Sequence, residues 1–215
     1  KEFLGKSGHF NGDDIIEIIV TQPATAKFIT TKLYNFFVSD DPPSEDEIKI
    51  LSDAYLTSGY DIKSVMRVLL NSDFFKNSRF TKVKSPTELV AGVLRLVGNF
   101  TEIKPGLIDV VMESGYMGQE LLNPPTVEGW HTGKEWIDSG SLVGRVNFAS
   151  EQVGNIDHPG VRSIVDYLAS QSAALYPEDL VDGCLELLGP MVVEDETRKP
   201  LVAQAKLGGI LRSET

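Results

Sequence analysis

The side chains best suited to chemistry in this sequence gather in one stretch, Met117–Phe148. It contains Asn123 followed by two prolines, then Trp130, His131 and Trp136. A histidine can act as a base or bind a metal, and a tryptophan can stack on a sugar ring or an aromatic group. We therefore take Asn123, Trp130, His131 and Trp136 as candidate ligand-binding residues, without assigning a catalytic residue.

The same stretch also fits a purely structural role. Pro124 and Pro125 each fix a φ angle, and Gly129 and Gly133 permit a left-handed backbone. Ordering an irregular loop of about 17 residues costs conformational entropy, which burial of a large apolar group can offset. In this interpretation, which we place first, the loop folds back and Trp130 is mostly buried in the helix bundle. A binding platform is the alternative.

Other sites of catalysis or cofactor binding have no support in the sequence. His9, His131 and His158 are far apart and none lies in a metal-binding spacing, so we expect no metal site. Asn11–Asp14 resembles the start of a calcium loop, but the later acidic ligand is missing and a helix N-terminus explains it better. No nucleotide loop or nucleophile elbow occurs, and we expect no cofactor. Cys184 lies in an apolar helical run and is predicted to be a buried thiol.

Composition and charge exclude several classes of protein. The chain has 215 residues, of which 41% are hydrophobic and 24% charged, an ordinary balance for a globular protein. Its formal net charge of −11 argues against nucleic acid or an anionic membrane as the main partner. No apolar run reaches the length of about 18 residues that a membrane span needs, and no signal peptide is visible.

The elements that position the candidate residues are predicted to be helices. Apolar residues recur at helical spacing, and Ser44–Glu47 and Ser85–Glu88 are capping boxes that mark two helix starts. One helix face is predicted to contain Ala26, Ile29, Leu33, Phe36 and Phe37. The helical pattern fails after Leu122 and resumes at Leu142. The sequence therefore predicts an all-α fold, a multi-helix orthogonal bundle with a long irregular loop containing prolines and tryptophans.

The domain organisation follows from one weak boundary at Gly154–Pro159. We expect a main helical domain over residues 1–153 and a smaller helical extension over residues 154–215 that packs on it. The chain begins at Lys1 without an initiator methionine and stops without a closing element. We therefore expect it to be an internal fragment of a longer protein.

Five motifs occur in an order that resembles the C-terminal half of a bacterial family catalogued as domain of unknown function 1800. They are Lys1–Ile16, Pro23–Val38, Gly59–Ile62, Lys84–Val90 and Met117–Trp130. One departure is His131, where the family often has proline. The resemblance implies a mainly helical protein, exported or held in the bacterial cell envelope. It implies no accepted activity and no catalytic residues.

Two functions stay open at this point. The first is a non-catalytic module, exported from the cell, that binds a partner protein or builds an envelope assembly. The second is part of a hydrolase that acts on an extracellular polymer, with Trp130, His131 and Trp136 lining the cleft. An enzyme requires His131 and a carboxylate to converge in a pocket beside the tryptophans, whereas a module requires only an exposed apolar patch.

Overall fold

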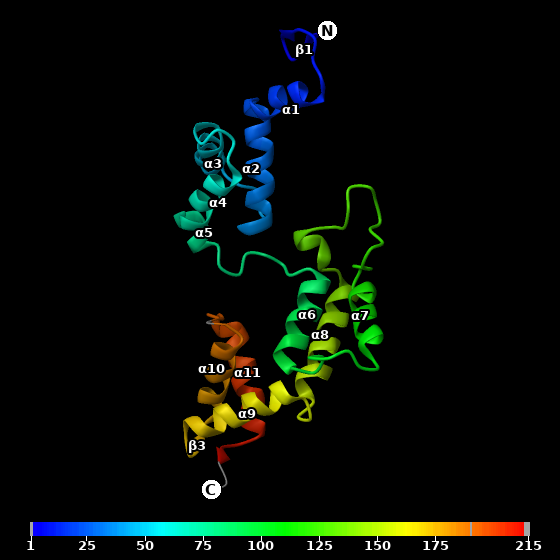
Figure 1. Ribbon diagram of the computed structural model, residues 1–215. Helices are drawn as coiled ribbons and strands as arrows, with labels where there is room; N and C mark the ends of the chain where they lie inside the picture. The colour runs from blue at the N-terminus through cyan, green and yellow to red at the C-terminus, as the bar shows by residue number, and fades with distance from the viewer. Residues whose placement is uncertain (1, 190, 213–215) are drawn as a thin grey trace. The chain divides into compact units, whose positions relative to one another are not determined.

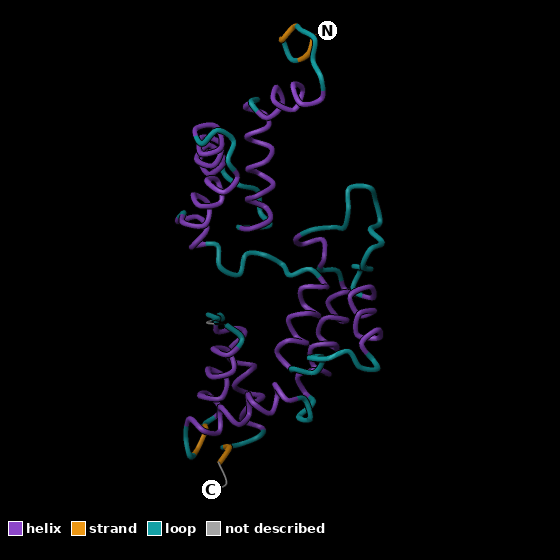
Figure 2. The backbone as a smooth tube through the Cα atoms, in the orientation of Figure 1, coloured by secondary structure: helices purple, strands orange, loops and turns teal. Residues whose placement is uncertain are grey.

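A computed structural model describes every residue except 1, 190 and 213–215 (Figure 1). The structure is 62% helical, which confirms the all-α prediction, and helices account for most of the trace in Figure 2. The helices are α1 Gly12–Val20, α2 Pro23–Phe37, α3 Glu45–Thr57, α4 Ile62–Asn71, α5 Asp73–Asn77, α6 Pro86–Val97, α7 Leu107–Tyr116, α8 Ser139–Gly154, α9 Pro159–Gln171, α10 Pro177–Leu187 and α11 Asp195–Leu207, with a 3₁₀ helix, η1, at Gly133–Trp136. Two short antiparallel pairs join β1 Glu2–Phe3 to β2 Lys6–Ser7 and β3 Ala174–Leu175 to β4 Leu211–Arg212.

Side-chain caps define several of the helix starts. The Ser44 hydroxyl accepts a hydrogen bond from the Glu47 amide, and the Glu47 carboxylate accepts one from the Ser44 amide, 2.7 Å away. The same reciprocal pair forms between Asn11 and Asp14 at the start of α1. These side chains satisfy amides that a helix leaves free in its first turn. The interpretation of Asn11–Asp14 as a helix start is therefore confirmed.

The chain divides into two compact units, which are described separately. Unit 1 contains residues 1–85 and 128–137, and unit 2 contains residues 86–127 and 138–215. The division expected from the sequence, between residues 153 and 154, falls inside unit 2 at the end of α8. Among the described residues, no helix is both long and apolar enough to span a membrane.

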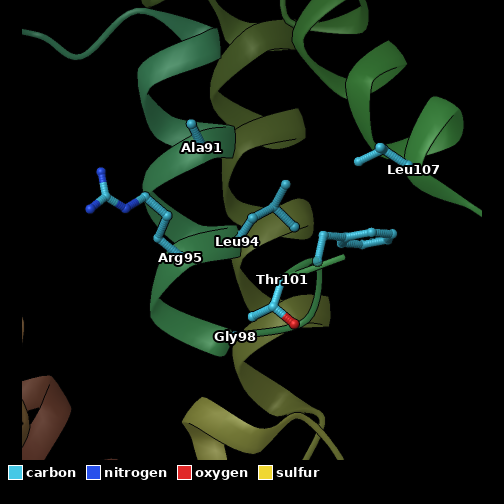
Figure 3. A pocket seen from close by; sticks show the side chains of 7 residues that line it. Ala91, Leu94, Arg95, Gly98, Thr101 and Leu107 are labelled. Carbon is cyan, nitrogen blue, oxygen red and sulfur yellow. The ribbon is translucent and has the colours of Figure 1, made fainter. Parts of the chain in front are cut away.

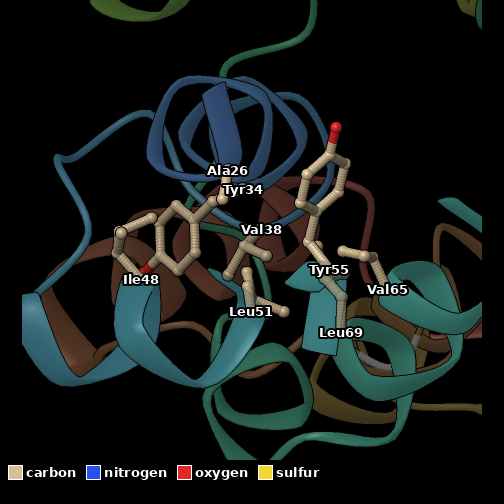
Figure 4. Close-up of a cluster of buried hydrophobic side chains, with 8 residues drawn as sticks. All are labelled: Ala26, Tyr34, Val38, Ile48, Leu51, Tyr55, Val65 and Leu69. Atoms are coloured by element: carbon tan, nitrogen blue, oxygen red, sulfur yellow. The ribbon is translucent and has the colours of Figure 1, made fainter. Parts of the chain in front are cut away.

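The core of unit 1 lies between α2, α3 and α4, as Figure 4 shows. From α2 and its C-cap, the core takes up Ala26, Thr30, Tyr34 and Val38, each four residues after the last, while Phe36 stays exposed. The Thr30 hydroxyl donates to the Ala26 carbonyl at 2.7 Å, so this polar residue is satisfied inside the core. The face predicted from the apolar residues was therefore rotated, because Thr30 and Tyr34 were not counted as core positions.

The core of unit 2 joins α6, the end of α7 and α8 through Val90, Met117 and Phe148. The start of α9 approaches α6 so closely that a Cβ on Gly160 would lie 2.0 Å from the Leu96 carbonyl oxygen. Only glycine permits this contact between two helix backbones. The helix pair α10 and α11 is joined by Arg198, which donates to both carboxylate oxygens of Asp182 at 2.8 Å.

Candidate functional site

The segment 128–137, called here the tryptophan turn, packs against the end of α2 within unit 1. Gly133 is buried at φ +61°, and a Cβ there would lie 3.0 Å from the Cβ of Asp40. The next residue, Lys134, donates to an Asp41 carboxylate oxygen at 2.8 Å, and this hydrogen bond raises the pKa of Lys134. Two consecutive residues therefore anchor the turn to the two aspartates that follow α2.

Asp40 is the centre of this arrangement, with only 6% of its side chain exposed. Its Oδ1 accepts from Lys82 Nζ at 2.8 Å, and its Oδ2 accepts from the Val83 amide at 2.6 Å. Lys82 Nζ also donates to the Asn35 carbonyl in the last turn of α2. A buried carboxylate is stable only with such partners. Asp40 thus holds the end of α2, the loop after α5 and the tryptophan turn in one arrangement.

The two tryptophans of the turn differ in burial. Trp136 is 5% exposed, whereas Trp130 is half-buried. Trp136 ends η1 and follows the anchoring residues Gly133 and Lys134, whereas Trp130 precedes them. Trp136 is therefore the more buried of the two tryptophans.

His131 pairs with a carboxylate of the same turn. Its Nδ1 lies 3.0 Å from Glu135 Oε2, and its ring meets the Trp136 ring edge-on at 6.4 Å. The side chains of His131 and Glu135 are 61% and 67% exposed. The carboxylate can orient the imidazole, but open solvent around the pair removes the advantage that a water-excluded site gives to acid–base chemistry.

Asn123 belongs to unit 2, whereas the other three candidate residues belong to unit 1. It is exposed, and its side-chain amide donates to Glu120 Oε2 at 2.8 Å within a local turn. The structure therefore places Trp130, His131 and Trp136 in one turn of unit 1 and assigns Asn123 to unit 2.

Exposed phenylalanines surround the same end of α2. Phe36 and Phe80 are 70% and 64% exposed, and Phe37 meets the Phe36 ring edge-on at 4.7 Å. The Thr81 hydroxyl donates to the Val38 carbonyl at 3.0 Å, which ties the loop carrying Phe80 to the end of α2. We call Phe36, Phe37, Phe80, Trp130 and His131 the aromatic rim.

Sequence reasoning missed most of this site. Phe36 and Phe37 were assigned to a core-facing stripe, and Phe80 and Asp40 carried no local signal of their role. Asp40 and Gly133 are 93 residues apart, as are Asp41 and Lys134, which are joined by an ion pair. Only Glu135 could have been found, because it follows His131 by four residues.

The cavity seen in Figure 3 lies in unit 2, between the C-terminal half of α6 and the start of α7. It has a volume of about 430 Å³ and an apolar lining that includes Leu94, Phe100 and Leu107. None of the four candidate residues lines it. The histidine and the carboxylate that an enzyme would require therefore do not meet in this cavity.

Possible metal ligands and the cysteine were considered within the part of the chain that the structure describes. No group of three histidine, cysteine, aspartate or glutamate side chains is placed to hold a metal ion among these residues. Cys184 on α10 is half-buried, and burial raises the pKa of its thiol. The thiolate, which is the reactive form, is therefore disfavoured.

Comparison with known proteins identifies the family. Neither the curated proteins nor the solved structures give a match to this chain. Residues 1–210 match the family described as "Protein of unknown function (DUF1800)". The match covers nearly the whole chain and confirms the resemblance drawn from the five motifs. The chain belongs to the DUF1800 family.

Proposed function

We propose that this chain is a non-catalytic binding module that holds a partner protein through the aromatic rim of unit 1. The observation that carries the proposal is the combination of exposure and anchoring. Phe36 and Phe80 stand in solvent, yet the backbone beside them is fixed by hydrogen bonds from Thr81 and Lys82 to α2. Aromatic side chains fixed before binding lose little entropy when a partner covers them.

The charges around the rim favour a largely apolar partner surface. Lys82 is paired with Asp40, and Lys134 with Asp41, so these two lysines are neutralised within the unit, whereas Arg79 next to Phe80 is exposed. Contacts at the rim therefore come mainly from rings, which are enriched at the centres of protein interfaces. The family resemblance supports a setting outside the cytoplasm, either as an exported protein or within an envelope assembly.

The second candidate is part of a hydrolase acting on an extracellular polymer. The observation that favours it is the His131–Glu135 pair beside Trp136, since a carboxylate-oriented imidazole is a common general base. A half-buried Trp130 could stack on a sugar ring next to this pair. We place it second because both members of the pair are exposed.

Site-specific photo-crosslinking in the native bacterial host tests the proposal. A photoreactive side chain replaces Phe80 in one protein and Ile50, an exposed apolar residue of α3, in the control. We expect one defined crosslinked protein from position 80 only, and its loss when Phe36→Asp is added. Equal crosslinking from both positions would contradict a specific site on the rim.

The hydrolase alternative needs its own measurement. Purified protein is incubated with isolated cell-envelope polymer, and released sugar fragments are detected by mass spectrometry. Release that His131→Ala abolishes, with an unchanged circular dichroism spectrum, would replace the binding proposal by the enzymatic one. The binding proposal expects no release from either protein.

A further inference from the structure

The outward face of α7 in unit 2 is apolar. Ile108 and Tyr116 are 78% and 75% exposed, and Val111 and Met112 are exposed between them. Their spacing of three, four and eight residues from Ile108 places all four on one side of the helix. The opposite side, with Val110 and Ser114, faces the unit 2 core. We call the four exposed residues the α7 stripe.

The cavity of unit 2 adjoins the N-terminal end of the α7 stripe. Leu107 lines the cavity, and Val111 follows it by one turn of the helix. In Figure 3, Leu107 and Leu94 flank the cavity from α7 and α6. Arg95 also lines the cavity, with its guanidinium pointing away from Leu94 and Leu107 in Figure 3. A mainly apolar hollow of about 430 Å³ beside an apolar helix face can accept a large anchoring side chain from a partner.

The charges along α7 specify the chemistry of that partner. Asp109 and Glu113 are four residues apart and follow the edge of the stripe beside Met112 and Tyr116. The helix carries no lysine or arginine, and the whole chain has a net charge of −11. We propose that the α7 stripe docks an amphipathic helix of a partner protein that has lysines or arginines along one edge and a bulky apolar residue for the cavity.

Two other occupants fit these charges less well. A second copy of the chain would bring the same acidic edge and the same net charge to the contact. An anionic membrane surface attracts basic helices and repels an acidic one. A cationic helix gains from both the apolar stripe and the acidic edge, because opposite charges at a rim favour association. This inference does not rest on the aromatic rim, which belongs to unit 1.

A synthetic peptide supplies the first test. The probe is a fluorescent amphipathic helix of leucine and lysine, about four turns long so that it can form a stable helix when bound. Its matched control keeps the leucines and replaces every lysine by glutamate. We expect fluorescence anisotropy to show saturable binding of the lysine peptide to the full chain and none of the glutamate peptide. Equal binding of the two peptides would overturn the assignment of charge.

Matched variants locate the binding. Ile108→Ser combined with Met112→Ser should weaken binding of the lysine peptide about tenfold, as loss of central apolar contacts does. The control, Leu142→Ser with Val146→Ser, removes two exposed apolar residues of α8 and should leave the affinity unchanged. All four residues are exposed, so circular dichroism should show folded protein in both cases. Equal weakening by the two pairs would refute a site on α7.

Charge variants and two further measurements complete the test. Asp109→Asn with Glu113→Gln should weaken binding and flatten its salt dependence. The control, Glu151→Gln with Glu186→Gln, changes two exposed glutamates of α8 and α10 and should do neither. A dimer in sedimentation that Ile108→Ser with Met112→Ser dissociates would assign the stripe to a second copy. Pelleting with phosphatidylglycerol vesicles that the same pair abolishes would assign it to a membrane. Either outcome overturns the proposal and leaves the aromatic rim untouched.

Discussion

The two halves of the irregular segment between α7 and α8 contrast sharply. Residues 118–127 belong to unit 2 and are mostly exposed, with Leu122 95% exposed at a positive φ of 66°. The tryptophan turn, residues 128–137, belongs to unit 1 and is anchored by Gly133 and Lys134. The two prolines lie in residues 118–127, whereas the two buried residues of the segment, Gly133 and Trp136, lie in the tryptophan turn, so local stiffness did not decide where burial occurs.

Tertiary partners explain the difference. In the tryptophan turn, the Gly133 backbone packs closely against Asp40, and Lys134 donates a hydrogen bond to the Asp41 carboxylate. Asn123 in the exposed half makes its side-chain hydrogen bond only to Glu120, three residues away. Burial of a loop requires a prepared surface elsewhere in the chain, because its polar backbone must find partners there. Substitutions that remove single contacts can test how much each contact of the segment contributes to stability.

The largest expected effect separates the two tryptophans. Trp136→Ala should destabilise unit 1 by about 3–5 kcal/mol, the usual cost of truncating a buried aromatic residue. Trp130→Ala should cost less, about 1–2 kcal/mol, because its side chain is only half-buried. Both tryptophans of the chain lie in unit 1, so the remaining one reports urea unfolding by fluorescence in each variant. Equal midpoints would mean that the turn has no single buried anchor.

The second effect concerns the nearly buried carboxylate. Asp40→Asn should cost about 1–3 kcal/mol, below the usual loss for a fully buried pair because Lys82 remains partly in solvent. Asp41→Asn is the matched control, since its pair with Lys134 is exposed on both sides, and its midpoint should not change measurably. Urea melts followed by tryptophan fluorescence compare the two. An Asp41 effect as large as that of Asp40 would show that the exposed pair with Lys134 anchors the turn as strongly as the nearly buried carboxylate does.

The third effect tests the close approach at Gly133. Gly133→Ala should cost about 2–3 kcal/mol, from left-handed backbone strain together with contact against Asp40. Gly59→Ala, at φ +70° with no atom within 4 Å of the added Cβ, should show the backbone strain alone, about 1 kcal/mol. The difference between the two, measured in the same unfolding assay, isolates the docking contact. If the two substitutions destabilise the protein equally, contact with Asp40 does not limit the residue at position 133.

The smallest effect has the opposite sign and falls in the exposed half. Leu122→Asn should stabilise unit 2 slightly, by about 0.5 kcal/mol, because asparagine tolerates a positive φ better than leucine. Little packing is lost, since Leu122 is almost fully exposed. Thermal unfolding followed by circular dichroism measures the change, with Leu121→Asn as the neighbour that should give no gain. Destabilisation by Leu122→Asn would reveal an apolar contact of Leu122. Residues 118–127 would then also be held by packing, as the tryptophan turn is.

The sequence predicted where helices begin more accurately than which side of a helix is buried. The capping pairs at Asn11 and Ser44 located the starts of α1 and α3, since a cap involves residues only three apart. The core face of α2 was misjudged at Phe36 because Thr30, whose hydroxyl bonds within the helix, looked polar in the sequence. For the candidate site, the sequence favoured Trp130 as the buried residue, and the structure buries Trp136 more deeply. Asn123 was grouped with the tryptophans although the structure places it in the other unit.

The sequence by itself determined the helical class, the helix starts and the family, because these depend on short-range periodicity, caps and ordered motifs. Only the tertiary structure decided that Trp136 is buried and that the Gly133 backbone packs against Asp40. It alone decided that Phe36 and the α7 stripe remain exposed. The physical reason is that burial is settled between distant segments, such as Asp41 and Lys134, whose pairing leaves no pattern in the local sequence.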